Sequence, residues 1–299
     1  MPGIIAAGGY VPRLRLQRKA IAEAHAWADP GIMARGKGER AICNWDEDAV
    51  TMGVEAARDA LDGLEQPVDV VYFASTSFPF ADRQNAGILT TALGLGEDVA
   101  SVDVSCSQRA GTSALLQALA AVQGGMYERA LVVAADHRQT KAGSAGELAY
   151  GDGAAAVVVE NAAGVTRFLG GHTATVDFVD HFRAAEQAFD YTWEERWIRD
   201  EGLAKIVPPA IGKALAKAGV DAGDVAHFVM PSTIGRAVQG IARASGIPED
   251  AIRGNLDGQV GECGTAHALV MLLAALESGD AKPGEKVVVA SFGQGCDVL

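Results

Sequence analysis

Residues 102–112 read Val-Asp-Val-Ser-Cys-Ser-Gln-Arg-Ala-Gly-Thr, and this stretch is the most informative turn in the chain. An apolar strand that ends in small residues and passes straight into a helix leaves those residues facing unpaired amide donors of the helix N-terminus. Such a turn suits a thiolate or an oxyanion. Cys106 is therefore a candidate nucleophile, although most unpaired cysteines are small buried side chains without chemical roles.

The segments on either side of this turn alternate between strand-like and helix-like patterns. Continuous Val/Ala runs predict strands covered on both faces, and longer amphipathic runs predict helices. This alternation is typical of parallel or mixed α/β layers. The two halves, 1–163 and 164–299, look like similar units, so we expect a duplicated fold with its site where they meet. Strands are predicted at 3–7, 68–74, 99–105, 131–135, 227–230 and 286–291, and helices at 49–61, 85–95, 110–122, 203–218, 234–244 and 265–276.

Composition excludes several classes of function. The 299 residues are 49% hydrophobic and 21% charged, which is typical of a globular protein. Subtracting 38 acidic from 25 basic side chains gives a net charge of −13, which disfavours nucleic acid as a partner. No apolar run approaches the roughly 18 residues of a membrane span, so we expect a cytoplasmic protein without membrane contact. The four cysteines stand singly, without the paired spacing of a zinc site.

Several motifs together resemble the thiolase superfamily, specifically its type III ketoacyl-ACP synthases and hydroxymethylglutaryl-CoA synthases. They occur in the expected order and span nearly the whole chain. The resemblance implies the duplicated five-layered α-β-α-β-α fold. The motifs are Arg-Gly-Lys-Gly-Glu-Arg at 35–40, Thr-Met-Gly-Val-Glu-Ala-Ala at 51–57, Tyr-Gly-Asp-Gly-Ala-Ala-Ala-Val-Val at 150–158 and Ser-Phe-Gly-Gln-Gly at 291–295.

The positions that carry catalysis in this family hold other residues here. The nucleophilic cysteine of the family falls on Gln108, and its histidine falls on Ser232. The asparagine falls on Glu262, and the glutamate of hydroxymethylglutaryl-CoA synthases falls on Thr76. An amide cannot be acylated as a thiolate can. Claisen condensation through an acyl-cysteine is therefore doubtful.

Three hypotheses follow from these replacements. The chain could be a non-catalytic subunit of a heteromeric thiolase or ketosynthase complex, since glutamine at this turn occurs in ketosynthase chain-length partners. It could act on carbon-carbon bonds next to a thioester, by condensation or retro-aldol cleavage, without an acyl-cysteine. In the third hypothesis the match between this turn and the family's motif is shifted by two residues, and Cys106 is the nucleophile. We favour the second.

Three neighbouring side chains are candidates for the acid or base of such chemistry: Glu262, Cys263 and His267. Cys263 and His267 are four residues apart, hence on one face of a helix, with Glu262 near its N-terminus. A buried carboxylate with few cations nearby would have a raised pKa. A solvated glutamate and a structural histidine are the alternative. Cys43 and Cys296 match no catalytic position and are expected to be structural.

Basic residues are scarce, so their clusters are informative. In the resembling family, the stretch that contains Arg35, Lys37 and Arg40 lies near the mouth that admits coenzyme A, where arginine can meet phosphates. A solvated charged loop is the alternative. The resemblance implies a coenzyme A thioester or acyl carrier protein as substrate, and no metal or redox cofactor. It also implies a homodimer or a heteromer with a second thiolase-like chain, and a zinc-ribbon/OB-fold protein as a further candidate partner.

Overall fold

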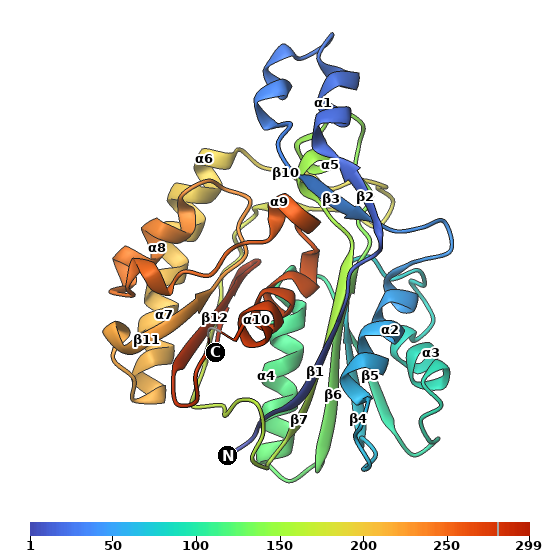
Figure 1. Ribbon diagram of the computed structural model, residues 1–299, viewed down its shortest axis with the longest axis vertical. Helices are drawn as coiled ribbons and strands as arrows, with labels where there is room; N and C mark the ends of the chain where they lie inside the picture. The colour runs from blue at the N-terminus through green and yellow to red at the C-terminus, as the bar shows by residue number, and fades with distance from the viewer. Residues whose placement is uncertain (280) are drawn as a thin grey trace.

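The computed structural model describes residues 1–279 and 281–299, and its main elements stack as helix, sheet, helix, sheet and helix. Broadly from right to left in Figure 1, these layers are α2 with α3, a five-stranded sheet, α4 with α10, a four-stranded sheet, and α7 with α8. The five-layered α-β-α-β-α architecture predicted from sequence is thus confirmed. The layer helices are α2 (Ala49–Leu61), α3 (Asn85–Ala92), α4 (Ala110–Gln123), α7 (Ala204–Ala218), α8 (Ala237–Ser245) and α10 (His267–Glu277).

The first sheet is mixed and has the strand order β1-β7-β6-β4-β5. β4 pairs in parallel with β5 and β6, whereas β7 runs antiparallel to β1 and β6. β6 and β7 are buried almost throughout, as expected for Val/Ala runs covered by helices on both faces. The strands are β1 (Gly3–Tyr10), β4 (Val70–Ala74), β5 (Ala100–Val104), β6 (Arg129–Asp136) and β7 (Gly153–Glu160).

The second sheet has the strand order β11-β12-β13-β8. β11 and β12 pair in parallel, and the two remaining pairs are antiparallel. α7 packs on its outer face, while α10 contacts both this sheet and the first one. The strands are β8 (His172–Thr175), β11 (Val225–Val229), β12 (Lys286–Phe292) and β13 (Gly295–Val298).

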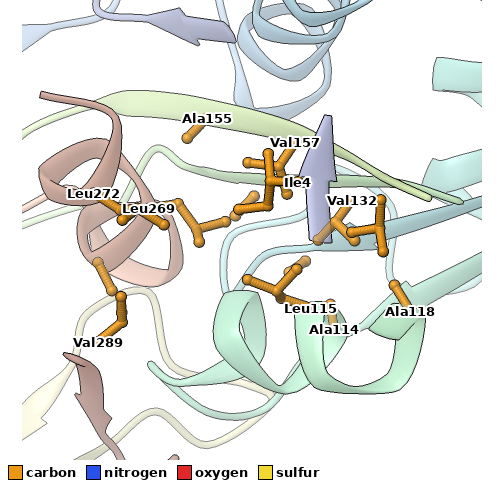
Figure 2. Packing of buried hydrophobic residues seen from close by; sticks show 14 of the residues in the cluster. Ile4, Ala114, Leu115, Ala118, Val132, Ala155, Val157, Leu269, Leu272 and Val289 are labelled. Atoms are coloured by element: carbon orange, nitrogen blue, oxygen red, sulfur yellow. The ribbon is translucent and has the colours of Figure 1, made fainter. Parts of the chain in front are cut away.

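The hydrophobic layer between the sheets joins the two halves. Figure 2 shows side chains of β1, α4 and β6 packed together with Leu269 and Leu272 of α10. Val289 of the second sheet belongs to the same buried cluster. Burying such aliphatic side chains contributes about 1.5–3 kcal/mol each. This layer fixes α4, and therefore the turn before it, against both sheets.

Shorter elements form the periphery. An excursion between β1 and α2 contains a two-stranded sheet, and a second small hairpin lies between β8 and α7. The peripheral elements are β2 (Leu14–Gln17), α1 (Arg18–His25), η1 (Pro30–Arg35), β3 (Glu39–Ile42), α5 (Ala145–Ala149), β9 (His181–Phe182), β10 (Tyr191–Thr192), α6 (Glu195–Trp197), η2 (Ile198–Leu203), η3 (Ala222–Asp224), η4 (Glu249–Ala251), α9 (Asp257–Val260) and η5 (Gly264–Ala266).

The predicted elements of the layers are all present, with shifted ends. The acidic stretch before α2 does cap it: Asp48 and Thr51 form a capping box. The last two predicted helices start later than expected, at Ala237 and His267. The short strands of the periphery, and β8 and β13, were not predicted because they lack a long apolar run.

Two further expectations concern organisation and location. The division into 1–163 and 164–299 stays a prediction. Within the described residues, no helix combines the length and apolarity needed to cross a bilayer. A cytoplasmic location also stays a prediction.

Candidate active site

The turn between β5 and α4 forms the floor of the candidate site. β5 ends at Val104 and α4 begins at Ala110. In the connection between them, Cys106 adopts a left-handed backbone with φ of 70°, an uncommon conformation for a side chain larger than glycine. Ser107 donates a hydrogen bond from Oγ to the Gly293 carbonyl at 2.9 Å, which ties this turn to the second half of the chain.

A cavity of about 230 Å³ opens above this turn. Its walls come from the end of β4, from the β9–β10 hairpin and from the loop between β12 and β13. Segments from before and after residue 163 therefore line it. The lining residues are Thr76, Ser105, Cys106, Ser107, Gln108, Asp180, His181, Phe182, Arg183, Asp190, Gly293 and Gln294.

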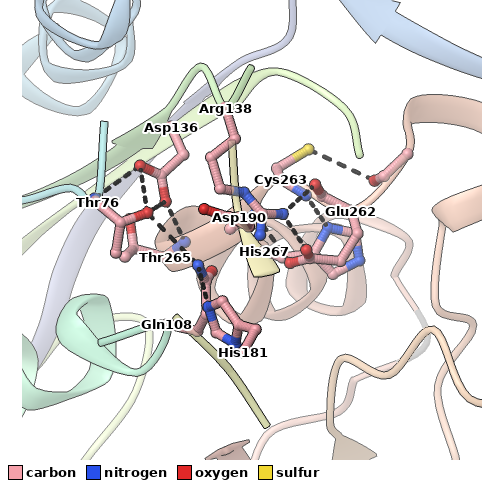
Figure 3. A network of polar contacts seen from close by, with 12 residues as sticks. Thr76, Gln108, Asp136, Arg138, His181, Asp190, Glu262, Cys263, Thr265 and His267 are labelled. Carbon is pink, nitrogen blue, oxygen red and sulfur yellow. Dashed lines mark hydrogen bonds and ion pairs between the residues drawn. The ribbon is translucent and has the colours of Figure 1, made fainter. Parts of the chain in front are cut away.

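Gln108 and His181 meet in this cavity (Figure 3). The Gln108 Nε2 atom lies 3.3 Å from Nε2 of His181 and 3.4 Å from Oγ1 of Thr76. On its other side, His181 Nδ1 lies 3.1 Å from the Asp180 carboxylate. Both contacts are satisfied when Nδ1 carries the proton toward Asp180 and Nε2 accepts from the amide. Nε2 is then unprotonated, and it is the basic atom of the site, with its lone pair directed at the Gln108 amide.

The pKa of His181 is raised above its usual value. Burial opposes the charged imidazolium, but the hydrogen bond and the charge of Asp180 outweigh burial. Asp190 adds to the increase in pKa, whereas the Arg138 cation opposes it. Histidine is the side chain most often used for general acid–base catalysis, and the higher pKa makes Nε2 of His181 a stronger base.

A second carboxylate, Asp136, fixes the wall that carries Thr76. Asp136 is fully buried at the end of β6. It accepts hydrogen bonds from the Thr76 N–H at 2.8 Å and from the Thr265 N–H at 2.7 Å. Oγ of Ser75 and Oγ of Ser77 also donate to it, at 2.9 and 2.7 Å. This cluster holds two strand ends and the start of the α10 segment in register.

Glu262 forms a buried ion pair with Arg138, whose guanidinium also lies 3.7 Å from the centroid of the Tyr150 ring. Oε1 of Glu262 accepts a hydrogen bond from the Gly264 N–H at 2.9 Å. Burial opposes ionisation, but Arg138 and these hydrogen bonds hold the Glu262 pKa below its usual value. The expectation of a raised pKa was therefore wrong, because sequence spacing does not reveal a cation 124 residues away.

Cys263 and His267 make contacts with the backbone. His267 is fully buried; Nδ1 accepts from the Cys263 N–H at 3.0 Å, and Nε2 lies 2.7 Å from the Asn255 carbonyl. Burial lowers its pKa, so the ring is neutral. Cys263 is also fully buried, and burial raises the pKa of its thiol. The expectation that the two share a helix face was wrong, because Cys263 precedes α10.

Comparisons with known proteins place this chain in a family. Residues 215–298 match the family described as 3-oxoacyl-[acyl-carrier-protein] synthase III C terminal. The hydroxymethylglutaryl-CoA synthase of Caldivirga maquilingensis is 30% identical, and the match covers 98% of this chain and 84% of that protein. The chain belongs to the hydroxymethylglutaryl-CoA synthase branch of the thiolase superfamily. The resemblance inferred from sequence motifs is confirmed.

A second sequence relative and two solved structures are also similar to this thiolase-superfamily chain. The hydroxymethylglutaryl-CoA synthase of Pyrococcus furiosus is 29% identical over 98% of the chain and 83% of its own length. The fold matches 3-oxoacyl-(acyl carrier protein) synthase III of Pseudomonas aeruginosa with a TM-score of 0.88 and 22% identity, covering 100% of this chain and 97% of that one. A variant of OleA from Xanthomonas campestris matches with a TM-score of 0.85 and 20% identity, covering 99% and 94%.

The positions that the sequence analysis matched to the family's catalytic residues lie in different places in this thiolase-superfamily protein. Gln108 and Thr76 line the cavity, together with Cys106, whereas Ser232 is not among its lining residues in the described chain. Instead, Oγ of Ser232 accepts a hydrogen bond from the Ile234 N–H at 3.2 Å. The Ser232 carbonyl accepts a second hydrogen bond, from the side-chain amide of Asn255. Glu262 is also outside the cavity lining in the described chain and lies in the network around Arg138 (Figure 3).

The three basic residues expected near the entrance for coenzyme A differ in their exposure to solvent. Arg35 and Lys37 are not buried, whereas Arg40 is. The Arg40 guanidinium donates to the Glu147 carbonyl at 2.8 Å. Burial lowers its pKa. A contact between Arg40 and a ligand phosphate would require this buried arrangement to open.

The sequence analysis missed His181, Asp180 and Arg183. They lie in a short hairpin without apolar periodicity, so no pattern placed them near the turn after β5. The adjacent Asp180-His181 pair was the one available signal, since histidine next to a carboxylate is a common acid–base arrangement. Arg183 pairs with Asp190 at 2.7 Å across the hairpin and also donates to the Thr76 carbonyl.

Proposed function

We propose that this protein is an enzyme that cleaves or forms a carbon-carbon bond next to a coenzyme A or acyl-carrier thioester, without an acyl-cysteine. The named relatives support the thioester, since they are a hydroxymethylglutaryl-CoA synthase and a 3-oxoacyl-(acyl carrier protein) synthase. The observation that carries the proposal is the contact between the Gln108 amide and Nε2 of His181 within the cavity. It supports a base next to the position that matches the family's cysteine.

Retro-aldol cleavage of a 3-hydroxyacyl thioester fits these groups. Nε2 of His181 takes the hydroxyl proton, and the carbonyl of the aldehyde or ketone product forms as the bond between C2 and C3 breaks. The bonding electrons pass to the thioester, giving an enolate whose oxygen accepts a hydrogen bond from the Gln108 amide. Proton return from the imidazolium to C2 gives the shortened acyl thioester. Aldol condensation is the same sequence reversed.

Unpaired acceptors around the cavity support a substrate with a hydroxyl donor. Three of the lining residues carry a buried oxygen without a hydrogen-bond partner in the described structure: Gln108 Oε1, Asp180 Oδ1 and Asp190 Oδ2. Such atoms are costly unless a ligand or a water satisfies them. A volume of about 230 Å³ is below the usual range for a drug-sized ligand, which favours a short acyl group.

The side chains of Arg35 and Lys37 are the proposed contacts for the coenzyme A phosphates. This assignment rests on the family resemblance and on their accessibility to solvent. Arg40 would act by holding the segment in place through Glu147.

Incubation of the purified protein with a short 3-hydroxyacyl-CoA tests the proposal. We expect a shorter acyl-CoA and an aldehyde or ketone in equal amounts. His181→Ala should lower kcat by at least about 100-fold, since a positioned base contributes that much. His172→Ala is a matched control, because His172 lies on β8 away from the cavity lining. Equal rates for the wild type and His181→Ala would refute the assigned role.

The absence of an acyl-cysteine has its own test. Cys106 is exposed and lines the cavity, so it is the thiol to examine. Intact-mass spectrometry after incubation with acyl-CoA should show no added acyl group, and Cys106→Ser should retain turnover. An adduct on Cys106 would support the third hypothesis from the sequence.

A non-catalytic role within a heteromer is the second candidate, and the replacement of all four matched family positions favours it. In that case the isolated chain would be inert. Activity would return only with a second thiolase-like chain that carries a cysteine, or with a zinc-ribbon/OB-fold partner. Co-purification with the products of neighbouring genes distinguishes this outcome from the first.

A further inference from the structure

Three side chains with metal-binding chemistry meet outside the cavity: Cys43, His137 and Asp152. One potential ligand atom from each lies within 4.8 Å of the other two. They come from separate segments, since Cys43 follows β3, His137 follows β6 and Asp152 precedes β7. A thiolate, an imidazole and a carboxylate are the three ligand types that zinc uses in proteins.

The backbone holds these residues in place. The Cys43 N–H donates to Asp152 Oδ2 at 2.7 Å, and the Asp152 N–H donates to the Ala41 carbonyl at 3.1 Å. The His137 N–H donates to Ser77 Oγ at 2.8 Å. Such anchoring reduces the conformational entropy that ligand binding would otherwise lose.

One polar atom of the cluster is buried without a hydrogen-bond partner in the described chain. The unpartnered atom is Oδ1 of Asp152, a residue only 1% exposed, whereas Nδ1 of His137 lies 3.1 Å from the other carboxylate oxygen, Asp152 Oδ2. Buried polar atoms are nearly always paired, so this carboxylate oxygen is available as a ligand for a cation. The His137 side chain is 39% exposed, which leaves a route for an ion and a water ligand.

The local charge also favours a cation. The carboxylates of Asp152, Glu47 and Asp48 act electrostatically on Cys43, whereas Arg40 is the cation that acts on His137. Three carboxylates and one guanidinium thus act on the proposed ligands. A divalent ion would offset this excess, together with the negative charge of a Cys43 thiolate.

We propose that Cys43, His137 and Asp152 bind one Zn²⁺ ion, with water as the fourth ligand. Binding forms Zn–S, Zn–N and Zn–O bonds, and the Cys43 thiol proton is released to solvent. The ion would tie the excursion between β1 and α2 to the ends of β6 and β7. Because His137 follows Asp136, it would also stiffen the carboxylate cluster behind the cavity. This role differs from the sequence-based expectation of no metal.

Cobalt provides a direct spectroscopic test on the full chain after chelator treatment. One equivalent of Co²⁺ should give a thiolate-to-cobalt absorption band in the near ultraviolet, and Zn²⁺ should displace it. Cys43→Ser should abolish the band, while Cys106→Ser, which alters the exposed cysteine, should keep it. A band that survives in Cys43→Ser, or that is lost in Cys106→Ser, would overturn the assignment.

Zinc affinity gives a second readout that does not depend on the thiol. Removal of a ligand should weaken binding by at least about 100-fold, since losing even an outer-shell partner costs about 10–100-fold. We therefore expect His137→Ala to lose the increase in Tm that Zn²⁺ gives the wild type. Circular dichroism without metal checks that the variant is folded. No zinc-dependent change in Tm in the wild type, or the same change in His137→Ala, would refute the site.

Discussion

At the scale of single residues, the proposed chemistry of the cavity depends on which side chain contacts the Gln108 amide. His181 occupies that position, with Asp180 behind it and Asp190 nearby. The histidine must be neutral to accept a proton, so the proposed activity should rise with pH as the ring loses its proton. Because its pKa is raised above 6.5, this rise should occur above pH 6.5.

Asp180→Asn tests that electrostatic arrangement. Without the carboxylate, burial and Arg138 should lower the pKa of His181, so the acidic limb of the kcat/KM profile should move to lower pH. The asparagine also fixes the ring tautomer less well, so we expect kcat to fall by about 10-fold or more. Rates measured across the pH range, beside wild type, check both effects. A profile with an unchanged acidic limb would argue against the His181–Asp180 pair.

Substitution of a second single residue, Glu262, should mainly change the free energy of unfolding. Glu262→Ala leaves the buried Arg138 guanidinium without its carboxylate, which should cost about 3 kcal/mol or more of unfolding free energy. Glu55→Ala is the control, because the Glu55–Arg58 pair is exposed and should contribute less than about 1 kcal/mol. Denaturant unfolding measures both. Equal losses for the two variants would contradict the buried pair.

The same pair sets a pH dependence of stability. The folded-state pKa of Glu262 lies below the model-peptide value of 4.5, so its contribution is fully present above pH 4.5. The contribution disappears as pH falls through the lower folded-state pKa. The difference in unfolding free energy between wild type and Glu262→Ala should therefore be constant near neutral pH and should shrink in acid.

At the scale of elements, the start of the α10 segment meets the end of β6 at Gly264. A Cβ there would lie 2.1 Å from Oδ2 of Asp136, and the backbone has φ of +59°. Only glycine allows this close approach, which lets the Thr265 N–H reach the same carboxylate. The turn thus connects the second half of the chain to the wall that carries Thr76.

Gly264→Ala should disrupt that connection. We compare it with Gly63→Ala, where φ is +75° and nothing lies within 4 Å of the added carbon. Gly63→Ala should cost about 1–2 kcal/mol from the left-handed backbone alone. Gly264→Ala should cost about 1–3 kcal/mol more from the clash, and turnover should fall as well. Thermal unfolding and activity measurements on both variants check this prediction. If Gly264→Ala and Gly63→Ala were equally stable, Asp136 would have moved away from the added carbon at no cost, contrary to the expected clash.

At the scale of the whole molecule, the first sheet ends in a strand that pairs with β4 on one side and, within the described residues, with no strand on the other. β5 is its edge, and Val102 in the middle of β5 is 40% exposed. Exposed edge strands with apolar side chains are sites of association. Since β5 leads into the Gln108 turn, association there would place the cavities of two protomers close to their common interface.

We predict a homodimer that pairs through this edge. Val102→Lys should shift the native mass from dimer toward monomer, because a charge would be buried in the contact. Met126→Lys, at an exposed position after α4, is the control and should stay dimeric. Analytical ultracentrifugation distinguishes the two masses. A monomeric wild type would contradict the predicted homodimer and would favour a heteromer.

Local sequence patterns were sufficient to predict the layers and the residue at the turn. Val/Ala runs, helix periodicity and glycine-bounded turns are short-range signals, so the main strands, the main helices and Gln108 after β5 could be read directly. The family followed from motifs of the same local kind. The match of Gln108 to the position of the family's cysteine stays a prediction.

Which groups meet in the site depends on packing between remote segments. His181 lies 73 residues from Gln108, and Glu262 lies 124 residues from Arg138, so neither pairing has a local pattern. The hairpin that carries His181 has no buried periodicity, and its position depends on packing against the ends of β4 and β12. Proton chemistry depends on distance, burial and neighbouring charge, and these arise only when such segments come together in the folded chain.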